Sequence, residues 1–207
     1  MKYINELTER YPALLPLKAE IETAVEKIVE SYKIGGKVLL CGNGGSASDS
    51  DHVAGELLKG FLMKREPFGE ELSALNKEMG EDAVKLQRGI PAIPFPQLSG
   101  VLSAFANDVD PSLVYAQLVY ALGKKGDVLI AFSTSGNSVN TVKAARCARA
   151  LGITVVSLTG ESGGALRSLS DISLRAPEKE TFKVQEYHLP IYHAICADVE
   201  NILFGGM

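Results

Sequence analysis

The chain has 207 residues, of which 46% are hydrophobic, so it is long and apolar enough for one domain with a substantial core. Its formal net charge of -4 argues against nucleic acid as the main ligand, and we expect no direct nucleic-acid binding. No apolar run reaches the length of a membrane span, and the charged start, MKYINELTER, has no apolar signal core. We therefore expect a cytoplasmic protein without a membrane part.

The elements follow one another in a regular order along the chain. Apolar residues recur at helical spacing through residues 1–35, which predicts an N-terminal helical segment that ends at Gly35-Gly36. Short apolar runs predict strands at residues 37–41, 127–132, 153–160 and 171–177, with a Pro-broken edge or short strand at 89–95. Helical spacing predicts helices between them, at residues 46–62, 112–126, 137–152 and 182–205.

This alternation of strands and helices predicts an α/β fold, with a parallel sheet covered by helices on both faces. The helix after the first strand would begin with Ser46 or Ser48 as its N-cap, and the last helix contains Pro190.

One segment interrupts the rhythm. The stretch from Lys64 to Gly89 is charged and helix-forming, and we interpret about residues 66–88 as a helical insertion. Its apolar side chains would be buried and its acids would face outwards, as in a helix that packs on a neighbour. We expect the insertion to cover a ligand cleft or a subunit contact. The apolar residues are Phe68, Leu72, Leu75, Met79, Val84 and Leu86.

The three cysteines, Cys41, Cys147 and Cys196, are far apart in the sequence and odd in number. That pattern favours buried free thiols in a reducing compartment over a disulfide framework or a nucleophile.

Three Gly/Ser-rich loops follow predicted strands, with the sequences CGNGGS, FSTSGNS and LTGESGG. Open α/β sheets bind ligands at that carboxyl edge. The first loop fits the Gly-x-Gly-x-x-Ala pattern of a dinucleotide site with Gly42, Gly44 and Ala47. A nicotinamide or flavin cofactor is disfavoured, because no second strand with a terminal acid follows about twenty residues later.

The second loop points to a phosphate. Four hydroxyls lie between a strand and the N-terminus of a helix, which carries unpaired N–H donors and a partial positive charge. A Gly-Lys-Ser/Thr triplet is absent, so a small phosphorylated metabolite fits better than a nucleoside triphosphate. The alternative is that these hydroxyls only cap the helix. The four residues are Ser133, Thr134, Ser135 and Ser138.

The chain has only three histidines, His52, His188 and His193. His52 and Glu56 share a helix face. Gln185 and His193 lie on one side of the last helix, whereas His188 points roughly 140° away from His193. If the two helices meet, His52, Glu56, Gln185 and His193 could hold zinc. The alternatives are a metal-free acid–base pair of Glu56 and His193, or a solvated glutamate and a core histidine.

Three motifs in this order, CGNGGSASDSDHVAGEL, FSTSGNS and VQEYHLPIYH, resemble the sugar isomerase (SIS) domain family, and within it the phosphoheptose isomerases. The resemblance implies a single SIS domain over residues 1–207, with a five-stranded parallel sheet in a Rossmann/flavodoxin-like three-layer sandwich. It also implies a homotetramer with sites at subunit interfaces, and zinc in some members. The reaction implied is conversion of sedoheptulose 7-phosphate to D-glycero-D-manno-heptose 7-phosphate through an enediol.

The resemblance also assigns roles by motif. Glu56 would be the base and His193 the acid, and the possible zinc ligands would be His52, Glu56, Gln185 and His193. The residues expected to bind substrate or its phosphate are Asn43, Gly44, Gly45, Ser46, Asn107, Asp108, Ser133, Thr134, Ser135, Ser138 and Gln185.

The sequence leaves rival functions open. Other SIS proteins are non-catalytic, either as assembly factors for replication initiation or as phosphosugar sensors, and a different phosphosugar could be isomerised. The stretch EKETFK before Gln185 lacks the aspartate and arginine expected in the family, which bears on which sugar fits. The complete set of His52, Glu56, Gln185 and His193 favours catalysis.

Overall fold

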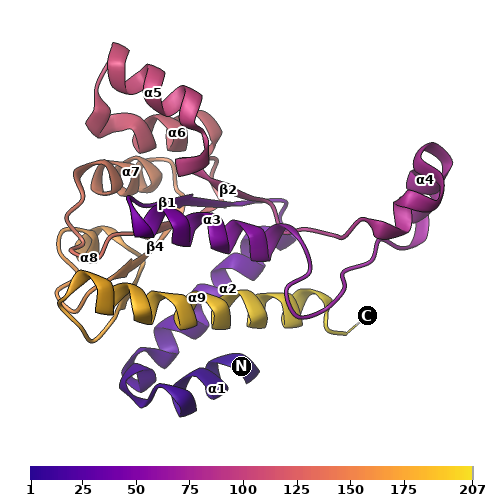
Figure 1. Ribbon diagram of the computed structural model, residues 1–207, viewed down its shortest axis with the longest axis horizontal. Helices are drawn as coiled ribbons and strands as arrows, with labels where there is room; N and C mark the ends of the chain where they lie inside the picture. Colours follow the sequence, from indigo (N-terminus) through magenta and orange to yellow (C-terminus); the bar gives the residue numbers. More distant parts are fainter. Residues whose placement is uncertain (207) are drawn as a thin grey trace.

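A five-stranded, all-parallel sheet forms the centre of the protein, in a computed structural model that describes residues 1–206 (Figure 1). The strand order is β2-β1-β3-β4-β5, and the predicted α/β class is confirmed. The strands are β1 (Val38–Cys41), β2 (Ala92–Pro94), β3 (Val128–Phe132), β4 (Thr154–Thr159) and β5 (Ile172–Arg175). β1 has β2 on one side and β3 on the other, so the order reverses between β1 and β3, where this topology binds ligands.

Helices cover both faces of the sheet, which explains why its strands read as continuous apolar runs. Along β1, Val38 and Leu40 enter the core on one face, whereas Leu39 and Cys41 enter the core on the other. The first core is closed by α1 (Lys2–Arg10), α2 (Lys18–Lys33), α3 (Gly45–Leu58) and α9 (Thr181–Phe204). The second is closed mainly by α6 (Val114–Leu122), α7 (Val139–Ala150) and α8 (Leu166–Leu169).

The N-terminal helical segment is divided. A 3₁₀ stretch, η1 (Pro12–Leu17), separates α1 from α2 and contains two prolines, which supply no backbone donor for a continuous α-helix. α1 is fixed to α9 because the buried Asp198 carboxylate accepts hydrogen bonds from the N–H groups of Tyr3 (3.2 Å) and Ile4 (2.9 Å).

Helix α3 differs from its prediction at both ends. Gly44, at φ 56°, is the N-cap, so Ser46 and Ser48 lie within the helix rather than at its cap. The helix ends at Leu58, four residues short of the predicted end, and Lys59 takes an extended conformation. Helix α5 (Ser99–Asp108), with short 3₁₀ turns η3 (Phe95–Gln97) and η4 (Pro111–Leu113) on either side, was not predicted.

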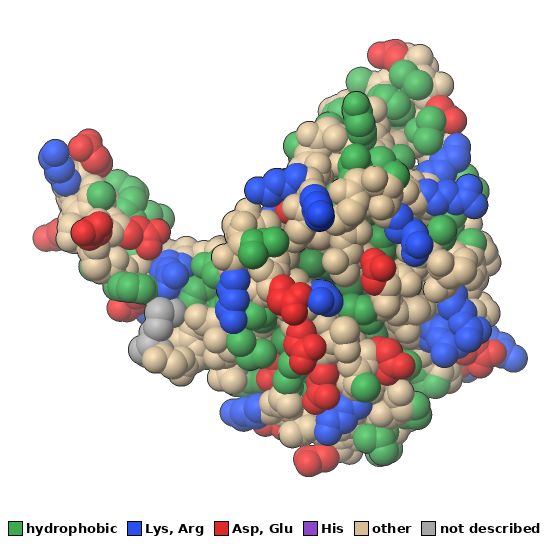
Figure 2. Space-filling view, turned by 180° about the vertical axis from the view of Figure 1, so that it is seen from behind, with side chains coloured by type: hydrophobic (Ala, Val, Ile, Leu, Met, Phe, Trp, Pro, Cys, Tyr) green, Lys and Arg blue, Asp and Glu red, His purple; other side chains and the backbone are tan. Residues whose placement is uncertain are grey.

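The insertion forms an arm, residues 66–88, that projects from the body (Figures 1 and 2). It contains α4 (Gly69–Met79) and η2 (Gly80–Lys85), and no residue of α4 is buried. A single chain does not bury the apolar side chains of the insertion as predicted. Exposed side chains are Phe68, Met79, Val84 and Leu86, and partly covered ones are Leu72 and Leu75. The arm therefore does not cover a cleft of its own chain. Among residues 1–206, no helix is long and apolar enough to cross a membrane.

Candidate active site

The first loop of the site leaves β1 at the point where the strand order reverses. Gly44 adopts a positive φ that L side chains disfavour, and this lets the chain turn from strand to helix within three residues. The Tyr115 hydroxyl of α6 donates to the Gly42 carbonyl at 2.6 Å and so holds the loop against α6. Gly45 opens α3 and lies against the side-chain amide of Gln185 from α9, so closely that a Cβ on Gly45 would collide with it.

A reciprocal amide pair joins this loop to the second loop. Asn43 donates to Asn140 and Asn140 donates to Asn43, both at 2.9 Å, although the two residues are 97 positions apart. Asn140 lies in the first turn of α7 and also accepts from the Thr141 N–H at 2.9 Å. Sequence analysis missed Asn140. The two glycine- and serine-rich loops therefore form one surface at the switch point.

The second loop, between β3 and α7, is held by its own short side chains. The hydroxyls of Ser133 and Ser138 lie 3.0 Å apart, and the Ser135 hydroxyl accepts from the Asn137 N–H at 3.1 Å. Ser138 is the N-cap residue of α7, yet its side chain makes no capping hydrogen bond. Ser138 therefore does not cap α7 with its side chain, and the binding of a phosphate by these hydroxyls stays a prediction.

The second loop also borders a hollow of ≈ 350 Å³. It is lined by Thr134, Ser135 and Asn137, and by Gly160, Ser162 and Lys179 among others. Lys179 is exposed and pairs with Glu161 at 3.2 Å. Glu161 and Glu178 also line the hollow, so an oxyanion here would meet hydroxyls and Lys179 but also two carboxylates.

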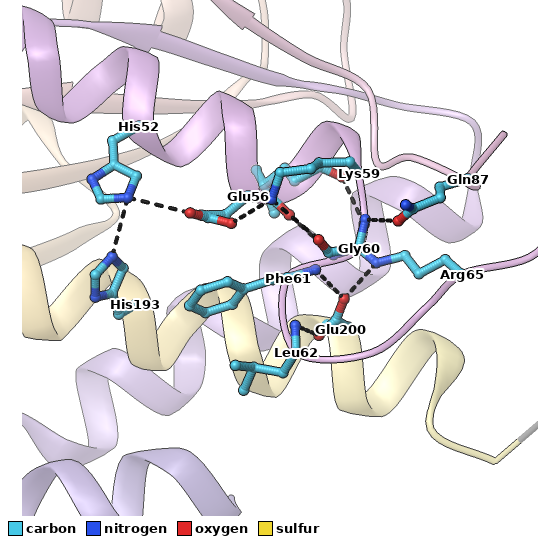
Figure 3. A network of polar contacts seen from close by, with 11 residues as sticks. His52, Glu56, Lys59, Gly60, Phe61, Leu62, Arg65, Gln87, His193 and Glu200 are labelled. Carbon is cyan, nitrogen blue, oxygen red and sulfur yellow. Dashed lines mark hydrogen bonds and ion pairs between the residues drawn. The ribbon is translucent and has the colours of Figure 1, made fainter. Parts of the chain in front are cut away.

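The second part of the site lies between α3 and α9, where three predicted residues come together (Figure 3). His52 Nε2 is 3.2 Å from Glu56 Oε1, one helical turn later, and 3.4 Å from His193 Nε2 on α9. The other Glu56 oxygen pairs with Lys59 Nζ at 3.1 Å. The Glu56 side chain is only 14% exposed, so its carboxylate is held between His52 and Lys59 and largely shielded from water.

Two residues that sequence analysis missed orient His52 from behind. The Tyr192 hydroxyl lies 3.0 Å from His52 Nδ1 and donates to Asp49 Oδ1 at 3.4 Å. Burial raises the pKa of Asp49 to about 6, against the opposing effect of the Tyr192 hydrogen bond. Because Nδ1 faces Tyr192, the Nε2 atom of His52 is directed at Glu56 and His193. The neighbours Asp49 and Tyr192 were detectable only as polar residues beside His52 and His193.

His193 and His188 lie on the same helix and serve different purposes. Burial, followed by the nearby His52, lowers the pKa of His193, so its imidazole is neutral at pH 7. His188 is fully buried with Nε2 at 3.3 Å from the Thr159 carbonyl, and burial lowers its pKa to about 4. His188 is therefore a core residue, in line with its predicted direction away from His193.

The remaining predicted residues lie apart from the cluster. Gln185 lies at the first loop against Gly45, and in the described chain it makes no hydrogen bond to His52, Glu56 or His193. Asn107 and Asp108 lie exposed at the end of α5, where the Asn107 amide donates to Asp108 at 2.8 Å. Ser46 is buried in the first turn of α3. The thiols are free, and burial raises the pKa of Cys41 and Cys196 to about 12, which excludes them as nucleophiles at neutral pH.

The donor set is suited to zinc in its chemistry but is not closed around one point. Within residues 1–206, no three His, Cys, Asp or Glu side chains form a group that could hold a metal ion as they stand. The two contacts of His52 Nε2, at 3.2 and 3.4 Å, nevertheless match the separation of about 3.3 Å between two ligands of one tetrahedral zinc.

The fold and the site together define a doubly wound α/β protein with a small-molecule site at its topological switch point. A model of the SIS domain family matches residues 2–89 and 98–160. Phosphoheptose isomerases of Clostridium acetobutylicum and Burkholderia pseudomallei are 38% and 39% identical over 90% and 91% of this chain, and over 84% and 85% of those proteins. The structure of a phosphoheptose isomerase from Francisella tularensis aligns with a TM-score of 0.78 at 30% identity, over 97% of this chain and 95% of that one. The chain belongs to the SIS domain family, and the resemblance drawn from its motifs is confirmed.

Proposed function

We propose that this protein is a phosphosugar aldose–ketose isomerase whose substrate is sedoheptulose 7-phosphate and whose product is D-glycero-D-manno-heptose 7-phosphate. The observation that carries the proposal is the meeting of Glu56, His52 and His193 between α3 and α9, beside a hydroxyl-rich loop at a helix N-terminus. The relatives named phosphoheptose isomerases, which share most of this chain's length, support the choice of substrate.

The reaction needs one group that removes a proton from carbon and one that protonates oxygen. Glu56 removes a proton from C1 of the ketose, and His193 donates a proton to the C2 carbonyl oxygen, which gives an enediol. Return of the proton from Glu56 to C2, with loss of the O1 hydroxyl proton to His193, gives the aldose. A neutral imidazole can act as the donor to a developing oxyanion, and the lowered pKa of His193 keeps it neutral.

The second loop has a different task. Hydroxyls of Ser133, Thr134, Ser135 and Ser138, with the N–H groups at the start of α7, bind the phosphate and so anchor the far end of the sugar. The middle of the sugar, between its phosphate and its reacting carbons, would contact Asn43, Gly44, Gly45 and Gln185. Anchoring fixes the position of C1 and C2 relative to Glu56 and His193, which is itself a major source of rate.

We propose zinc as a cofactor, held by His52, Glu56 and His193, with Gln185 as a fourth ligand only if its side chain leaves Gly45. When bound, the metal would stabilise negative charge on the enediolate oxygens. The donor types and the separations at His52 Nε2 support this.

We also propose that the working form is a cytoplasmic homotetramer. Apolar side chains stay exposed on the arm, where a second subunit would cover them, and the free cysteines suit a reducing compartment. Analytical ultracentrifugation of the whole chain, and of a chain in which residues 66–88 are replaced by a short linker, tests the assembly. A monomer at micromolar concentration would contradict the tetramer.

The function is tested by incubating the protein with sedoheptulose 7-phosphate and following anomeric proton signals by NMR. We expect aldose signals to grow, and to grow about 10²-fold more slowly, or slower still, in Glu56→Gln. Turnover of another ketose phosphate alone would reassign the substrate. Binding without turnover of any ketose phosphate would favour the non-catalytic alternative.

A further inference from the structure

A buried ion pair lies beside the His52–Glu56–His193 cluster, further along α9 and past the end of α3 (Figure 3). Arg65, in the segment that follows α3, donates from Nε to Glu200 Oε1 of α9 at 2.7 Å, and neither side chain is exposed to solvent. The Phe204 ring covers the guanidinium at 4.9 Å. A buried pair of this kind is tolerated only where its other polar atoms are also bonded, so the partners of those atoms show what the pair holds in place.

Arg65 holds the end of α3. Its Nη1 donates to the Leu57 carbonyl at 2.7 Å, and its Nη2 donates to the carbonyl of Glu56 itself at 3.1 Å. These carbonyls belong to the last turn of the helix, where no intrahelical donor is available. Because a guanidinium is planar, its three bonds fix the last turn of α3, with Glu56 on it, relative to Glu200.

Glu200 holds the turn that carries the chain away from α3. Its two oxygens accept from the N–H groups of Phe61 (2.8 Å) and Leu62 (2.7 Å). The Phe61 ring packs on the His193 imidazole, with ring centroids 5.6 Å apart. Glu200 follows His193 by seven residues, which is about two turns along the same face of α9. The pair therefore reaches both halves of the acid–base site.

We propose that Arg65 and Glu200 are positioning residues, which set the distance between Glu56 and His52 on α3 and His193 on α9 without touching the sugar. The expected effect on kcat rests on the proposed function. The contact between the two imidazoles spans only 3.4 Å, and displacement of reacting groups by about 1 Å can cost roughly 10²-fold in rate.

The chain offers a matched control at β3. Asp127 is fully buried just before β3, and its carboxylate accepts from the N–H groups of Lys37 (3.0 Å) and Lys124 (2.9 Å). Lys37 Nζ completes the set at 2.6 Å. Glu200 and Asp127 are thus both buried carboxylates with two backbone donors and one cation, but only Glu200 lies beside the candidate site.

The test compares Glu200→Gln with Asp127→Asn in the whole chain. We expect both to lower the melting temperature. Glu200→Gln alone is expected to lower kcat at least about tenfold with KM within about threefold, and to shift the imidazole ¹⁵N signals of His52 and His193. The signals of His188, in the core, serve as an internal reference. Arg65→Lys keeps the charge but loses the fork, and it should give the same pattern more weakly.

Each other outcome overturns the proposal. Unchanged kcat and unchanged imidazole signals in folded Glu200→Gln would do so, as would an equal loss of kcat in Asp127→Asn. If Glu200→Gln does not fold, Arg65→Lys is judged by the same two readouts, and failure of both to fold reduces the pair to a folding determinant. If the wild-type protein turns over no ketose phosphate, the proposed function fails, while the imidazole signals still decide whether the pair positions the histidines.

Discussion

The loop between β3 and α7 and the pair of helices α3 and α9 form a site in opposite ways. The loop uses short side chains that hydrogen-bond within seven residues, and its donors include backbone N–H groups. The helix pair uses long side chains from segments about 140 positions apart, supported by Tyr192, Arg65 and Glu200. The difference suggests a division of labour, with binding assigned to the loop and proton transfer to the helices. Kinetics can separate the two, because lost anchoring raises KM and lost proton transfer lowers kcat.

The largest effect is expected from Glu56→Gln, which keeps the side-chain shape and removes the base. We expect kcat to fall by about 10²-fold or more, the usual scale for an acid–base group, with KM little changed. Glu186→Gln, an exposed residue on α9, is the control and should retain full activity. Steady-state assays by NMR or by coupled detection give both constants. Full activity of Glu56→Gln would remove the helix pair from the chemistry.

Metal removal should separate the two regions next. Elemental analysis of freshly purified protein is expected to find zinc, and a strong chelator should lower kcat at least about tenfold, with recovery on adding zinc back. Phosphate-ester binding by the loop should persist in the chelator, which isothermal titration with an unreactive sugar phosphate would measure. Full activity in the chelator with no bound metal would leave Glu56 and His193 as a metal-free pair.

A smaller effect is expected in the loop. Ser135→Ala removes one hydroxyl near the phosphate, and a hydrogen bond to a charged group contributes about 1.5–3 kcal/mol, so KM should rise about tenfold or more. The value of kcat should change little. A sugar without the phosphate is the control, because its weaker binding should be the same in the variant and the wild type. A fall in kcat instead of a rise in KM would break the division between loop and helices.

The smallest effect concerns pH. The pKa of His193 is lowered, so we expect kcat to be level at neutral pH and to fall only below about pH 6.5, as protonation of His193 places a cation beside His52. The measurement should follow kcat rather than kcat/KM, since a phosphate monoester itself titrates near pH 6. A fall in kcat that starts above pH 7 would contradict a neutral His193.

Stability has its own pH dependence through His188. Its pKa is about 4 in the folded protein, below an unfolded value of about 6.5, so its contribution is present above pH 6.5 and lost as pH falls towards 4. The loss should be on the order of 3 kcal/mol, measurable by denaturant unfolding at several pH values. His188→Gln should flatten that dependence.

Local patterns were enough to predict the sheet, because buried parallel strands are apolar runs and the helices between them keep their period. Helix α5 was not predicted, because its sequence SGVLSAFAND is rich in residues with modest helix propensity. The division of the first helical segment was signalled by Pro12 and Pro16, which outweigh the helical spacing around them.

The sequence predicted the residues of the candidate site, but not the residues that hold them in place. Spacing on one helix placed His52 with Glu56, but whether α3 meets α9 depends on tertiary packing. Asn140 and Glu200 act on residues 97 and 135 positions away, and no local pattern marks such partners. The arm was mispredicted for a related reason. Its apolar spacing predicted burial, but a single chain leaves these side chains exposed or only partly covered.

The contact between Gly45 and Gln185 ties two distant positions into one unit of evolutionary change. Any side chain at position 45 would occupy the space of the Gln185 amide, so the Gln185 side chain must move away or be replaced by a smaller one. A new side chain at position 45 would therefore displace the Gln185 amide from the first loop, whereas a smaller residue at position 185 would leave room for one. Libraries that vary the two positions together would sample both changes at once.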